Sequence, residues 1–133
     1  SETPQLQPYQ PLNQLPILEQ KNWDKVHDSM RRVVHSKRGT AKRIGRKSKY
    51  TIAGKTGTAQ GYTVKQDEEY NEDEIPEHLR DHALFVAFAP LEDPEIAIAV
   101  IVENGGHGGS VAAPIAKKIM DRYLLESHTG TNG

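Results

Sequence analysis

Residues 83–102 read ALFVAFAPLEDPEIAIAVIV, and this stretch decides the fold. Two apolar runs, Ala83–Ala89 and Ile96–Val102, flank a polar segment that contains Pro90 and Pro94. Two such runs joined by a short turn are typical of an antiparallel hairpin. Because both runs are almost continuously apolar, we expect both faces of the hairpin to be covered.

Apolar residues recur at helical spacing on either side of the hairpin. We expect a first amphipathic helix that is capped by Asn22 and ends near His35, with an apolar face formed by Trp23, Val26, Met30, Val33 and Val34. After the glycine-rich turn at 105–109, we expect Ser110 to cap a second helix that runs to about Leu125. Its predicted inward face comprises Val111, Ile115, Ile119, Met120, Tyr123 and Leu124.

A third strand is expected over Tyr50–Gln60, which is rich in β-branched and small residues. Three strands and two helices predict an α+β fold in which an antiparallel β-sheet is covered by helices. Two helices are few for two nearly all-apolar strands. We therefore expect the fold to be incomplete in this chain and part of the sheet to be covered from outside it.

Composition sets the limits of the fold. The chain has 133 residues, a formal net charge of −1 and no cysteine, and its mean hydropathy is −0.69. This size predicts a single core, and the absence of cysteine excludes disulfides and thiolate chemistry. Residues 1–20, with four prolines and five glutamines, are expected to be an extended connector; 21–125 form the domain, and 126–133 a disordered tail. We expect no membrane-crossing segment or signal peptide in these residues.

The charges lie in two blocks. Residues 31–49 carry nine cations and no acid, and we expect a solvated basic loop there, beside the cleft. Residues 61–81 carry eight acids and are expected to form an acidic loop with a helical turn around Glu77–Leu79, able to act as a lid. The basic block leaves open a nucleic-acid or anionic-membrane contact. The chain has few aromatic residues to stack on bases, so we expect no nucleic-acid partner.

The sharpest local motif is Lys55-Thr56-Gly57-Thr58 on the predicted strand. Strand alternation places Lys55 and Gly57 on one face, so a cation stands beside a position without a side chain. The hydroxyls of Thr56 and Thr58 suit a carboxylate, and a strand edge offers N–H groups to a peptide or an oxyanion. The plainer alternative is an edge strand whose lysine prevents aggregation and whose glycine marks a bulge.

The histidines give a weaker signal. His78 and His82 are four residues apart and, with Glu74, suggest a metal site. Pro76 interrupts the helix that such a pair needs, so we interpret both as solvated loop histidines. His107 lies in the glycine-rich turn, which we interpret as a sharp bend that lacks the ending of a phosphate-binding loop. We expect no metal and no cofactor.

Four segments together resemble the C-terminal part of the penicillin-binding protein 2 family, the class B transpeptidases of Gram-negative cell elongation. They are Ala53-Gly-Lys-Thr-Gly-Thr-Ala-Gln60, Glu69-Tyr-Asn71, the run from His78 to Pro90, and the run from Ile96 to Gly106 before the closing helix. The similarity spans roughly residues 20–125, and Lys-Thr-Gly is the strand motif of the penicillin-interacting serine enzymes.

The resemblance implies a penicillin-binding protein/β-lactamase-like transpeptidase fold and a serine acyl-enzyme that cross-links peptidoglycan stem peptides and is the target of β-lactams. It implies that Lys55 supports the proton network of the serine, that Thr56 and Thr58 bind the substrate carboxylate, and that Gly57 leaves room for the substrate backbone. The N–H of Thr58 would complete the oxyanion hole. It further implies a periplasmic protein anchored to the inner membrane, with an elongation glycosyltransferase and scaffold proteins as partners.

The sequence departs from the family pattern in one respect. None of its six serines begins a Ser-x-x-Lys or a Ser-x-Asn motif. We therefore expect the nucleophile in the N-terminal remainder of a longer polypeptide, and we expect this chain alone to be inactive. The alternative from another class is a non-catalytic peptide- or polyanion-binding module built on the same strand edge.

Overall fold

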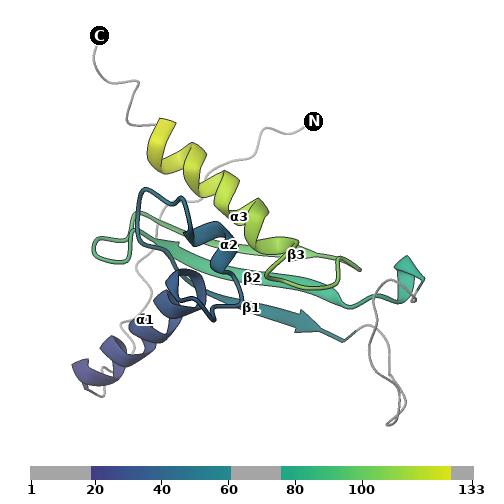
Figure 1. Cartoon of the computed structure of the whole chain (residues 1–133), viewed down its shortest axis with the longest axis horizontal. Helices are drawn as coiled ribbons and strands as arrows, with labels where there is room; N and C mark the ends of the chain where they lie inside the picture. Colours follow the sequence, from purple (N-terminus) through teal and green to yellow (C-terminus); the bar gives the residue numbers. More distant parts are fainter. Residues whose placement is uncertain (1–18, 61–75, 127–133) are drawn as a thin grey trace, which may run out of the picture.

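The computed structural model describes residues 19–60 and 76–126, and it has the α+β architecture predicted from the sequence (Figure 1). The elements in chain order are α1 (Gln20–His35), α2 (Lys42–Gly45), β1 (Ala53–Ala59), the 3-10 turn η1 (Glu77–Leu79), β2 (His82–Ala89), β3 (Ile96–Val102), α3 (Ala112–Asp121) and the π-helical η2 (Arg122–Glu126). The described residues thus contain the three predicted strands and both predicted long helices.

The three strands form one antiparallel sheet in the order β1-β2-β3. The predicted hairpin is confirmed, because β2 and β3 pair from Ala83↔Val102 to Ala89↔Ile96. β1 is shorter than the expected strand over 50–60, since the Thr51 carbonyl accepts the Leu91 N–H and the Ile52 N–H donates to a side chain. Within the described residues β1 pairs with β2 alone, so its other edge is open.

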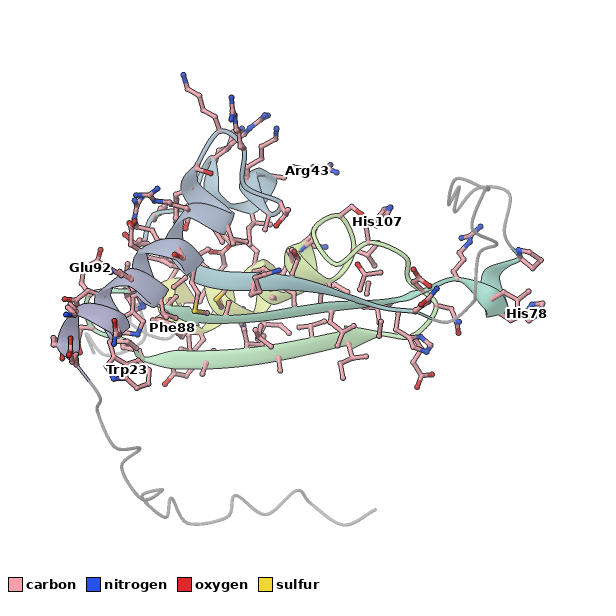
Figure 2. The ribbon with its side chains drawn as sticks, turned by 90° about the horizontal axis from the view of Figure 1, so that it is seen from below. Trp23, Arg43, His78, Phe88, Glu92 and His107 are labelled. Atoms are coloured by element: carbon pink, nitrogen blue, oxygen red, sulfur yellow. The ribbon has the colours of Figure 1, made fainter. Side chains whose placement is uncertain are left out.

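The two long helices lie on opposite faces of the sheet (Figure 2). Alternate residues of β2, including Phe85 and Ala87, are buried in the core that α3 covers. On the other face α1 lies over one end of the sheet, where the His27 ring meets the Phe88 ring edge-on at 5.4 Å. Further along this face, Val86 and Ile101 remain 46% and 67% exposed. This exposed apolar surface agrees with the expectation that part of the sheet is covered from outside the chain.

The inward face of α3 differs from the prediction. The predicted core residue Met120 is buried, and Val111 and Leu124 pack on the core. The predicted core residues Ile115, Ile119 and Tyr123 are 40% to 47% exposed, and the sheet is instead met by three small residues, Ala112, Ala113 and Ala116. The small side chains allow the helix to approach the sheet closely. The predicted cap was also wrong: the N-cap is Val111, and the Ser110 hydroxyl donates to the His107 carbonyl instead.

Two further predictions near α1 were wrong. The N-cap is Glu19, three residues before the expected cap Asn22, and the helix begins at Gln20. The Asn22 N–H donates to the Glu19 carbonyl. The basic segment is not entirely loop, because it contains the last turn of α1 and the single turn α2. Ile44 on α2 and the preceding Ala41 are buried beside Val34, and this apolar contact stabilises the turn.

The helical turn predicted around Glu77–Leu79 is confirmed as η1. The connector 1–18, most of the acidic loop (61–75) and the tail 127–133 lie outside the described residues. The domain boundaries and the lid therefore stay predictions.

A histidine fixes the start of β1. The His35 Nε2 atom at the end of α1 accepts the N–H of the buried Ile52 at 3.0 Å. Burial, aided by the positive charge of Arg31 and opposed by Glu92, lowers the pKa of His35 from its ordinary value. The neutral imidazole that accepts this hydrogen bond is therefore favoured in the folded protein.

The hydrogen bond between Ile52 and His35 predicts that the folded protein is less stable in acid. Because the folded-state pKa of His35 is lowered, its contribution to stability is complete above the unfolded pKa, about 6.5, and is lost as the pH falls below that value. We expect the difference in free energy of unfolding between wild type and His35→Gln to shrink from pH 8 to pH 5. Urea unfolding of the polypeptide that carries this chain, measured at both pH values, checks this. A difference that does not change with pH would contradict it.

A second set of polar contacts joins the segment before β1 to α3. The Tyr50 hydroxyl donates to Asp121 Oδ1 at 2.8 Å, and Lys117 Nζ contacts the same carboxylate at 2.5 Å and lies 5.2 Å from the centre of the Tyr50 ring. Burial and the Asp121 carboxylate raise the pKa of Tyr50, which keeps its hydroxyl a donor. These contacts hold the segment that leads into β1 against α3.

Candidate functional site

The Lys55-Thr56-Gly57-Thr58 motif lies in β1, as predicted. The register pairs Lys55 with Val86, Thr56 with Phe85, Gly57 with Leu84 and Thr58 with Ala83. Directly opposed residues share a face, so Lys55 and Gly57 lie on the face of Val86, and both threonines lie on the face of Phe85. The Lys55 ammonium group and the two hydroxyls therefore lie on opposite faces of the sheet. A single ligand could contact both only at the open edge of β1.

Lys55 is exposed and borders α1. Its Nζ atom donates to the Thr56 carbonyl at 2.8 Å. Beside it is a hollow of about 320 Å³ lined by Lys25, Val26, Ser29, Met30 and Val33 of α1. Lys55 thus lies at the strand edge next to a partly apolar hollow. Its positive charge would attract an anionic ligand that binds at this edge.

Thr56 has a partner that the sequence analysis did not identify. Its Oγ1 atom lies 3.0 Å from Oγ1 of Thr40, in the segment between α1 and α2. Thr58, the other predicted hydroxyl, is exposed on the same face of the strand. Only the proximity of Gly39 and Ala41, two small residues around one threonine, distinguishes Thr40 in the sequence.

The glycine-rich turn is more than a sharp bend. A Cβ atom on Gly108 would lie 2.2 Å from the Leu84 carbonyl oxygen and 2.6 Å from that of Gly57, and one on Gly109 would lie 2.3 Å from the Thr40 carbonyl oxygen. Backbone therefore packs on backbone beside the motif, which only glycine permits. His107 in this turn is exposed, and Figure 2 shows it beside β1.

The segment before β2 is clamped by the turn after β3. Asn104, which adopts a φ of 54°, donates its N–H to His82 Nδ1 at 2.9 Å and its side-chain amide to the carbonyls of His78 and Arg80. The interpretation of His82 as a solvated loop residue was wrong, because it begins β2 and accepts this hydrogen bond. Over residues 19–60 and 76–126, no group of three or more histidine and acidic side chains is placed to hold a metal ion.

The basic segment touches the motif through Thr40, but its cations do not all lie there. Arg43 projects outward from α2 (Figure 2). A hollow of about 430 Å³ between α2 and α3 has Ile44 and Pro114 among its lining, together with the cations Arg43, Arg46, Lys47, Lys117 and Lys118. Among the described helices, none is long and apolar enough to cross a membrane.

Comparison with known proteins gives consistent matches. Residues 5–121 match the family described as the penicillin binding protein transpeptidase domain. The peptidoglycan D,D-transpeptidase MrdA of Acinetobacter baumannii is 51% identical over 105 residues, which are 79% of this chain and 15% of that protein. The chain spans about one-sixth of the length of the curated relatives that it matches first.

Two solved structures share the fold. Penicillin-binding protein 2 of Pseudomonas aeruginosa, solved in complex with WCK 5153, superposes with a TM-score of 0.71 and 46% identity, over 94% of this chain and 24% of that one. Penicillin-binding protein 2 of Helicobacter pylori, solved in complex with MreC, gives a TM-score of 0.69 and 33% identity, over 89% and 20%.

Proposed function

Since this chain belongs to the penicillin-binding protein transpeptidase domain family, we propose that it is the C-terminal part of a peptidoglycan D,D-transpeptidase and supplies the Lys-Thr-Gly strand of the active site. The observation that carries the proposal is the position of this motif at the open edge of β1, with the cation and the hydroxyls on either side of that edge. A peptide that pairs with the edge would meet both kinds of group.

The reaction is acyl transfer. A serine hydroxyl attacks the carbonyl of the D-Ala-D-Ala bond, and D-alanine leaves as its nitrogen takes up a proton. The amine of a neighbouring stem peptide then attacks the acyl-enzyme, and the serine regains its proton. The serine comes from the N-terminal remainder of the polypeptide, because no Ser-x-x-Lys occurs in this sequence. The same remainder covers the exposed apolar face at Val86 and Ile101.

Each motif residue has a supporting role in this reaction. Lys55 holds the proton network around the serine and adds positive potential for the carboxylate. Thr56 and Thr58 donate hydroxyl protons to that carboxylate, and the Thr58 N–H contributes to the oxyanion hole. Gly57 leaves space for the substrate backbone. The exposure of Lys55 and Thr58 in this chain is compatible with a ligand at the edge.

Two relatives support part of the wider setting that we propose. The Pseudomonas aeruginosa relative was solved with WCK 5153 and the Helicobacter pylori relative with MreC. We propose β-lactams as inhibitors, a scaffold protein and an elongation glycosyltransferase as partners, and the periplasmic side of the inner membrane as the location, with the anchor outside this chain.

Intact mass spectrometry tests the proposal. The full-length polypeptide that carries this chain is incubated with benzylpenicillin and then denatured. We expect it to gain one penicillin mass, and a sample unfolded before the incubation to gain none. If the folded full-length protein gains no mass, the transpeptidase proposal is wrong, and a non-catalytic binding module becomes the better description.

A further inference from the structure

Thr40 and Thr56 form a hydroxyl pair at the edge of the candidate site. Their Oγ1 atoms are 3.0 Å apart, although the residues are 16 positions apart in the sequence. Each threonine hydroxyl has one proton to donate and lone pairs to accept with, so only one of the two protons lies between them. The other proton is free for a third group.

The backbone around Thr40 is held from two sides. The N–H of Ala41, its buried neighbour, donates to the Val33 carbonyl at 3.0 Å. A Cβ atom on Gly39 would lie 2.2 Å from the Val33 carbonyl oxygen, so this residue also packs directly on the end of α1. On the second side, the turn that contains Gly109 packs on the Thr40 carbonyl. Thr40 is therefore held in place by α1 and by the glycine-rich turn.

The same turn also contacts Thr56. A Cβ atom on Gly109 would lie 3.5 Å from Thr56 Cγ2, at ordinary contact distance. Three segments that are distant in the sequence thus meet around the Thr40–Thr56 pair: the segment after α1, β1 and the turn before α3. The side chain of Thr40 thus contacts a residue of the motif itself.

We propose that Thr40 is a positioning residue, which donates its hydroxyl proton to Thr56 and so leaves the Thr56 proton free for the carboxylate of the acyl donor. This inference rests on the proposed function of the same site. A hydroxyl that accepts one hydrogen bond becomes a better donor in the next, because the bonds polarise one another. Thr40 thereby sets both the direction and the strength of carboxylate recognition without contacting the substrate.

Acylation kinetics of the full-length polypeptide test this inference. Thr40→Val keeps the shape and removes the hydroxyl, and Thr40→Ser keeps the hydroxyl. We expect Thr40→Val to lower the second-order rate of benzylpenicillin acylation about five- to tenfold, the size of one lost hydrogen bond, and Thr40→Ser to stay within about twofold of wild type. Thr51→Val, a matched replacement before β1, serves as the control and should acylate like wild type.

A double-mutant cycle separates positioning from simple packing. If Thr40 acts through Thr56, Thr40→Val has no further effect in a Thr56→Val background. An equal loss in both backgrounds, or a Thr40→Val rate equal to wild type, would overturn the inference. Thermal unfolding of each variant identifies any that misfold, and Thr40→Ala then replaces Thr40→Val in the cycle. Wild type without an adduct would refute the proposed function itself, and the inference with it.

Discussion

Replacement of Lys55 by alanine in the full-length polypeptide is expected to lower the rate of β-lactam acylation by about 10³-fold, within the range for loss of a group that assists proton transfer. Lys55 is the only cation of β1 and stands at its open edge. The change removes both a member of the proposed proton network and the positive potential that attracts the ligand carboxylate. Stopped-flow or quenched mass spectrometry with benzylpenicillin measures the rate.

Two variants make the Lys55 result specific. Lys25→Ala removes a lysine of α1 from the same hollow and is expected to acylate like wild type. Lys55→Arg keeps the charge but gives up an amine that exchanges protons, so we expect it to bind the ligand and acylate slowly. A Lys55→Ala protein that acylates within about threefold of wild type would remove Lys55 from the mechanism.

The sheet could be predicted because its signals are local. The two apolar runs and the Pro90–Pro94 turn specify the hairpin within about 20 residues of sequence, and Figure 1 shows it in the predicted place. The alternation of Lys55, Thr56, Gly57 and Thr58 between faces follows from the period of a strand. These parts of the site needed no knowledge of distant contacts.

The face of α3 could not be predicted from its largest side chains. Two stripes of this helix are apolar: the alanines with Met120, and Ile115 with Ile119 and Tyr123. Apolar periodicity alone favours the larger residues. The structure buries the alanines together with Met120, which the prediction included, since close approach of the helix to the sheet requires small side chains. In the proposed whole domain the exposed stripe is a further surface for the missing remainder.

The contacts of Thr40 and Gly108 could not be predicted from the sequence for another reason. Both residues lie outside the regular strands and helices, and both reach β1 from segments distant in the chain. A glycine in a turn is usually explained by local backbone conformation. Here Thr40 meets β1 through a pair of hydroxyls and Gly108 meets it through backbone packing, and no local pattern predicts either contact. The glycine-rich turn therefore reverses the chain and also forms part of the candidate site.

Replacement of Gly108 by alanine is expected to disturb both stability and acylation. The added Cβ atom would lie 2.2 Å from the Leu84 carbonyl oxygen and 2.6 Å from that of Gly57, and both neighbours are strand backbone. The Gly108 carbonyl also accepts the Ala113 N–H at the start of α3. The turn therefore has to move off the sheet or push the strand at Gly57. We expect a loss of about 3 kcal/mol in the free energy of unfolding, as in an overpacked core.

The same movement affects the chemistry, because Gly57 and Thr58 bear the proposed substrate contacts. A displacement of about 1 Å at such a site costs roughly 10²-fold in rate, so Gly108→Ala should acylate far more slowly than wild type even where it is fully folded. Ser110→Ala, in the same turn, removes a hydroxyl whose partner is the His107 carbonyl and should leave both measurements near wild type. Urea unfolding and benzylpenicillin acylation of the full-length variants provide the comparison. A Gly108→Ala protein with wild-type stability and acylation rate would show that the turn does not pack tightly on β1. It would also refute the proposed link between the turn and the site.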